Sequence, residues 1–97
     1  MLLNRANVIL GIYDLSKGGV SSCSVDLKIV LSIALKGHAS SIVLLHNYPS
    51  GKLEPSNNDK IITKKLKKAC SYLDLVLLDH LIITKDSFYS FNDNNIL

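Results

Sequence analysis

The stretch SIVLLHNYPSGKLEPSNND, residues 41–59, decides the fold because it joins a buried strand to a helix through a polar loop. Its first five residues form a short continuous apolar run, typical of a strand buried on both faces in a mostly parallel sheet. Ser56 follows Pro55 and precedes Asp59 by three residues, a capping-box-like spacing that predicts the start of a helix. Ligands of open α/β sheets bind where loops leave the carboxyl ends of strands, so this loop is a candidate site by position alone.

The rest of the chain divides into apolar segments separated by turn-forming residues. We expect strands at residues 6–15, 20–24, 41–45, 75–84 and 87–91, and helices at 26–37 and 56–73. Gly18-Gly19 marks the first turn, and Asp26 caps the first helix. The order β-β-α-β-α-β-β predicts an α/β fold, a single domain over residues 1–97 with one helix on each side of the sheet. The polar tail after residue 91 is expected to fray.

Composition indicates a small globular domain and excludes several other classes of protein. The 97 residues are 47% hydrophobic and 20% charged, which suits one compact core. A net charge of +3 is too small to argue for nucleic acid without a clustered patch. We find neither an uninterrupted run of about 18 apolar residues nor a signal-peptide pattern. Cys23 and Cys70 form no CxxC unit, so we expect two buried thiols in a soluble cytoplasmic protein without membrane contact.

The loop also carries ligand types that a hydrolytic zinc site uses. Such a site needs about three protein ligands with water in the open position, and a general base, usually a glutamate. A His-x-His pair at a strand end projects both imidazoles to one side, and a third ligand can come from the next helix. His46 and Asp59 occupy two of these three positions, whereas Tyr48 occupies the position of the second imidazole.

These residues resemble a known family. His-x-His, seven residues, Ser, two residues and Asp is the signature of JAMM/MPN-type metalloproteases. The form with Asn between the histidines, then Pro-Ser-Gly and a later Pro-Ser, is similar to the bacterial RadC-type JAB domain. This chain reads HNYPSG at 46–51, PS at 55–56 and then Asp59, with every spacing kept. The resemblance continues through LDH at 78–80 and SFYSF at 87–91, and it spans essentially the whole chain.

The resemblance implies a fold, a metal and a reaction. It implies a JAMM/MPN-like, cytidine-deaminase-like sheet flanked by helices. It further implies that His46 and Asp59 are zinc ligands and that Ser56 stabilises the tetrahedral intermediate. The implied reaction is hydrolysis of a peptide or isopeptide-like bond in a peptide or protein substrate, with water as the nucleophile.

Two departures from the family pattern predict an impaired hydrolase. Tyr48 replaces the second histidine ligand, and a phenol must lose its proton to bind zinc well, whereas imidazole binds in its neutral form. The general-base glutamate of the family lies on a strand before the first strand of this chain, which we interpret as an N-terminally truncated domain. The single glutamate, Glu54, lies in the loop and is interpreted as solvated. The chain then has no general base.

Several alternatives remain beside this hypothesis. The chain could instead be a metal-free module for homodimerisation or protein docking. A third alternative is DNA binding, in keeping with the DNA-repair label of RadC-type proteins, through Lys60, Lys64, Lys65, Lys67 and Lys68. We interpret this lysine face as a solvated helix surface. Asp79-His80 is interpreted as a structural pair where a strand crosses the site, rather than as part of a metal site or a triad with Ser50 or Ser56.

Overall fold

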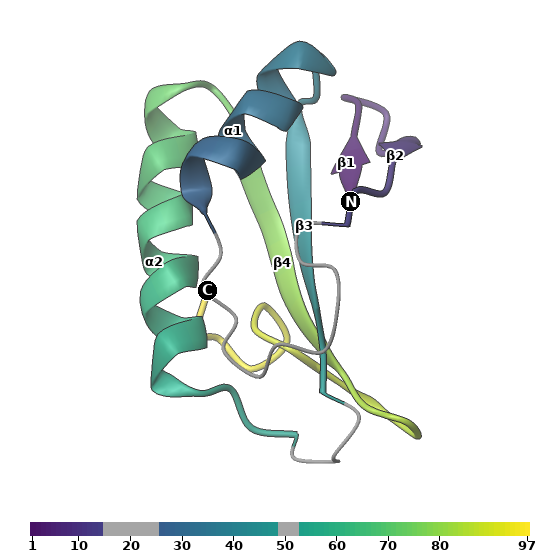
Figure 1. The fold of residues 1–97 in the computed structure, drawn as a ribbon, viewed down its shortest axis with the longest axis vertical. Coiled ribbons are helices and arrows are strands. Elements are labelled where there is room, and N and C mark those ends of the chain that lie inside the picture. The colour runs from purple at the N-terminus through teal and green to yellow at the C-terminus, as the bar shows by residue number, and fades with distance from the viewer. Residues whose placement is uncertain (15–25, 49–52) are drawn as a thin grey trace.

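The computed structural model describes residues 1–14, 26–48 and 53–97 of the chain. Within these ranges the chain forms a five-stranded sheet with strand order β2-β1-β3-β4-β5, together with two helices (Figure 1). The elements are β1 (Leu2–Leu3), β2 (Ile9–Gly11), α1 (Leu27–Lys36), β3 (Ser41–Asn47), α2 (Asn57–Tyr72), β4 (Val76–Ile83) and β5 (Phe88–Ser90). This order confirms the expected α/β fold. No helix in the described part of the chain is long and apolar enough to cross a bilayer.

The sheet is mixed rather than mostly parallel. Among the strands of the described residues, only the pair β3–β4 is parallel, whereas β1–β2, β1–β3 and β4–β5 are antiparallel. Residues 41–44 of the apolar run at the start of β3 are buried, as expected of a central strand, whereas Leu45 at its end is exposed. Burial on both faces reports a central position and does not fix the direction of the neighbouring strands, which explains the difference.

The N-terminal strands differ from the expected strand at 6–15. The chain forms two short strands, β1 and β2, with a turn at Asn4. The Asn4 side chain accepts hydrogen bonds from the backbone N–H groups of Ala6 and Val8, at 2.9 and 3.0 Å. Asn7 has a φ of 60°, a left-handed conformation that asparagine tolerates. This turn chemistry overrides the strand propensity of the segment. The expected turn at Gly18-Gly19 and the strand at 20–24 lie outside the described residues.

Both helices begin directly after the capping residues that the sequence indicated. Asp26 accepts a hydrogen bond from the backbone N–H of Lys28 at 2.9 Å, and α1 ends at Lys36 with Gly37 as its C-cap. Ser56 and Asp59 form a reciprocal capping box at the start of α2. This local chemistry fixes the first turn of α2 beside the end of β3.

The two helices cover the same face of the sheet, so the expectation of one helix on each side is wrong. One hydrophobic cluster contains side chains of both helices and of one face of β3: Val30, Ala34, Ile42, Leu44, Leu66 and Cys70. The connections β2-α1-β3 and β3-α2-β4 each join parallel strands and advance in the same direction across the sheet. Because such crossovers are right-handed, both helices must lie on one face.

The C-terminal tail is docked rather than frayed. The backbone N–H of Ile96 donates to the carbonyl of Phe91 at 3.0 Å, and Lys67 Nζ on α2 donates to the Leu97 carbonyl at 2.9 Å. Leu97 also packs against the hydrophobic cluster. The last residues therefore return to α2, close to the buried Phe91.

Candidate metal centre

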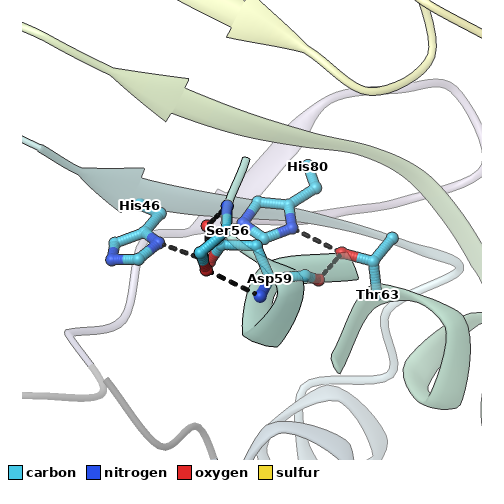
Figure 2. Close-up of polar contacts among 5 residues, drawn as sticks. All are labelled: His46, Ser56, Asp59, Thr63 and His80. Atoms are coloured by element: carbon cyan, nitrogen blue, oxygen red, sulfur yellow. Dashed lines mark hydrogen bonds and ion pairs between the residues drawn. The ribbon is translucent and has the colours of Figure 1, made fainter. Parts of the chain in front are cut away.

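Three side chains of types that can bind a metal meet where β3 ends and α2 begins (Figure 2). His46 lies near the end of β3, Asp59 lies in the first turn of α2, and His80 lies on β4. One ligand atom from each of the three side chains lies within 4.8 Å of the other two. In the register of β3 and β4, His80 pairs with Leu44, so it shares a face with His46 two residues further along β3.

Asp59 is buried and holds several hydrogen bonds as an acceptor. Its exposed fraction is 4%, and its Oδ2 accepts from both the backbone N–H and the hydroxyl of Ser56 at 2.9 Å. Its Oδ1 lies 2.8 Å from His46 Nδ1. Burial alone would raise the pKa of Asp59, but the hydrogen bonds from Ser56 and His46 outweigh it and lower the pKa below its ordinary value. Asp59 is therefore a carboxylate at neutral pH, and His46 Nδ1 donates to it.

His80 is buried and electrically neutral at neutral pH. Its exposed fraction is 4%, and its ring stacks on Phe91 with centroids 4.5 Å apart and an interplanar angle of 13°. Burial lowers the pKa of His80 to about 4. Its Nδ1 lies 2.6 Å from the hydroxyl oxygen of Thr63. A neutral imidazole is the form in which histidine binds a metal.

The donor set fits zinc in chemistry and nearly in spacing. Two imidazoles and a carboxylate are ligands that zinc accepts, with a fourth position open for water. Ligand atoms about 2.0–2.1 Å from a tetrahedral ion lie about 3.3 Å from one another. Because the three atoms already lie within 4.8 Å of one another, side-chain shifts on the order of 1 Å would suffice.

The structure brings together most of the residues that the sequence singled out. His46, Ser56 and Asp59 form one connected group, while the ring of Tyr48 lies against the ring of His46 with centroids 4.2 Å apart. Glu54 is exposed. The ligand roles predicted for His46 and Asp59 stay predictions, and Tyr48 lies beside His46.

Sequence reasoning missed His80, which was interpreted as structural. The reason is a bulge in β4: Ile42 pairs with Leu77, but Val43 pairs with Asp79, so Leu78 is the extra residue. Without the bulge, Asp79 would face the site and His80 would face the opposite side, because a shift by one residue reverses every side chain. With it, Asp79 instead accepts hydrogen bonds from Ser90 Oγ and from two backbone N–H groups.

Comparison with known proteins shows which proteins the chain resembles in sequence. The family model described as RadC-like JAB domain matches residues 1–96. A UPF0758 protein of Flavobacterium johnsoniae is 46% identical over 96 residues, which cover 99% of this chain and 42% of that protein. A UPF0758 protein of Porphyromonas gingivalis is 41% identical over 98 residues, covering 100% of this chain and 43% of the relative. The chain thus spans about two fifths of the length of these relatives. With nearly every residue matched, the chain belongs to the RadC-like JAB domain family.

Proposed function

We propose that this chain binds zinc through His46, Asp59 and His80 and is a weak or inactive hydrolase of peptide or isopeptide-like bonds. The observation that carries the proposal is the convergence of these three side chains, whose ligand atoms lie within 4.8 Å of one another. Membership of the RadC-like JAB family supports the same location, because the sequence resemblance implies that His46 and Asp59 are the zinc ligands.

The residues of the proposed site have different roles. Zinc would supply Lewis-acid activation of a bound water. Asp59 brings the negative charge, and the two histidines bring neutral nitrogen ligands. The Ser56 hydroxyl donates to Asp59 Oδ2 and accepts from the Asp59 N–H at 3.0 Å, so it orients the carboxylate. To stabilise a reaction intermediate, Ser56 would have to rotate away from the carboxylate.

We propose weak turnover for the chain as given, because its residues offer little that could act as a general base. Glu54 is the only glutamate in the chain, and it is exposed. Proton transfer by a positioned base contributes about 10²–10⁴-fold to the rate of such reactions. We therefore propose that the chain keeps its metal site but has lost efficient catalysis. A peptide or protein is the proposed natural ligand.

Metal binding is tested by titration of chelator-treated protein with zinc, followed by measurement of the metal content of the dialysed protein. The wild-type chain should retain about one zinc ion. His80→Gln and Asp59→Asn should each lose it, because each removes one of three ligands. His38→Gln is the matched control, since His38 is exposed and lies outside the cluster. Wild-type protein that retains only traces of zinc would refute the proposal.

A second candidate function is a metal-free module that binds a second copy of the chain. The observation that favours it is the face of the sheet opposite the helices, where Leu45, Ile83 and Phe88 are 41%, 37% and 60% exposed. Sedimentation equilibrium should then detect a dimer that Phe88→Ser weakens. A wild-type chain that stays monomeric at high concentration would exclude this candidate.

A further inference from the structure

We propose that Thr63 is a positioning residue that selects the metal-binding tautomer of His80. The inference rests on the proposed zinc site and adds a residue to it. Thr63 lies on α2, one turn after Asp59, and its exposed fraction is 2%. Its hydroxyl oxygen lies 2.7 Å from the Asp59 carbonyl oxygen and 2.6 Å from His80 Nδ1.

Both contacts of the Thr63 hydroxyl can be hydrogen bonds in only one arrangement of the hydrogen atoms. A hydroxyl group carries a single hydrogen, and a carbonyl oxygen can only accept. The hydroxyl of Thr63 must therefore donate to the Asp59 carbonyl. His80 Nδ1 must then carry a hydrogen and donate to the Thr63 oxygen. The result is a directed chain of hydrogen bonds from His80 through Thr63 to the backbone of Asp59.

This direction determines which nitrogen of His80 is available to a metal. A neutral imidazole carries one ring hydrogen, so a hydrogen on Nδ1 leaves the lone pair on Nε2. Figure 2 shows Thr63 at the edge of the His80 ring away from His46. Metal-binding histidines usually donate their second ring N–H to such a partner, which fixes the tautomer and the ring orientation.

Helix geometry and packing hold the arrangement in place. A threonine hydroxyl in a helix readily bonds to the carbonyl four residues earlier, which is the Asp59 carbonyl here. The stacked ring of Phe91 covers one face of the imidazole, so rotation of His80 is restricted as well. A single hydroxyl thus links the backbone of one candidate ligand to the side chain of another.

The test compares Thr63→Val, which has the same shape without the hydroxyl, with Thr63→Ser, which keeps the hydroxyl. Long-range ¹H–¹⁵N NMR of the chelator-treated protein reports the tautomer of His80, and competition with a chromogenic chelator reports zinc affinity. We expect hydrogen on Nδ1 in wild type and Thr63→Ser. We expect a loss of this preference in Thr63→Val and a roughly 10–100-fold weaker affinity for zinc. Thr84→Val is the control, because it removes a hydroxyl that bonds to Ser87 within the β4–β5 turn.

The outcomes separate this inference from the proposed function. Hydrogen on Nε2 of His80 in the wild-type protein would overturn the role of Thr63, even if zinc binds and even if Thr63→Val fails to fold. Unchanged zinc affinity and tautomer in folded Thr63→Val would overturn it too. Hydrogen on Nδ1 without zinc binding would instead support the tautomer selection and refute the zinc site.

Discussion

Lowering the pH from 7 to 5 should destabilise the metal-free protein through His80. The pKa of His80 is about 4 in the folded chain, against 6.5 for an ordinary histidine, because burial disfavours the charged ring. Between these two values the unfolded chain binds more protons than the folded chain, so the free energy of unfolding rises with pH. The contribution of His80 is complete above pH 6.5 and is lost as the pH falls toward 4.

The size of this effect follows from the two pKa values. One unit of pKa difference corresponds to about 1.4 kcal/mol. A pH of 5 lies about 1.5 units below the ordinary histidine value, so the expected loss is about 2 kcal/mol. A domain of this length has a free energy of unfolding of roughly 5–15 kcal/mol, so the loss is readily measured. The pKa of Asp59 is lowered, and its contribution is lost only at more acidic pH.

Urea unfolding in the presence of a chelator, at several pH values between 5 and 7, measures this effect. His80→Gln keeps a polar side chain but has no titratable ring, so its stability should change by about 2 kcal/mol less than that of wild type over this range. His38→Gln should keep the wild-type pH dependence, because the exposed His38 is not part of the cluster. Equal losses in wild type and His80→Gln would refute the assignment of a buried neutral His80.

Three further predictions concern the site and its surroundings. Tyr48→His should raise zinc affinity in the same chelator competition without restoring hydrolysis of a fluorogenic peptide, because the base is still missing; full activity in this variant would contradict our assignment. Ser56→Ala should lower the free energy of unfolding by about 1–2 kcal/mol, since it removes the α2 cap, and Ser56→Thr should recover most of that loss in the same melt. The double variant Lys64→Gln/Lys68→Gln should bind DNA at low salt no differently from wild type. Salt-sensitive DNA binding by wild type that the double variant loses would instead support a role for the lysine face.

Much of the fold could be predicted from the sequence because local signals, such as helix caps and apolar runs, determine where the elements lie. Asp26 and Ser56 cap the helices, and the apolar run after residue 41 forms the central strand, so these elements appear where the patterns indicated. The helix faces were predicted wrongly because, with right-handed crossovers, the face that a helix covers depends on strand order, which local patterns do not encode. The docked tail was missed for a similar reason. Its partner Lys67 on α2 is distant in sequence, and its partner Phe91 is buried in the core.

The candidate site was predictable where its spacing is local and was missed where it depends on strand register. His46, Ser56 and Asp59 lie within fourteen residues of one another, so their spacing carried the prediction. His80 faces the cluster because of the bulge in β4, and the leucine at position 78 is not a residue type that predicts a bulge.

The hydrogen bonds of the cluster indicate that the proposed metal site is largely formed without a metal. Asp59 serves as part of the α2 capping box and as the partner of His46, so its charge is satisfied without an ion. His80 is likewise held between Thr63 and Phe91. In proteins whose structural metal supplies the folding energy, the ligands have no such partners and the chain unfolds without metal. Here the ligands are already oriented by the fold, so zinc would exchange hydrogen bonds for coordination bonds and would add to stability only by mass action.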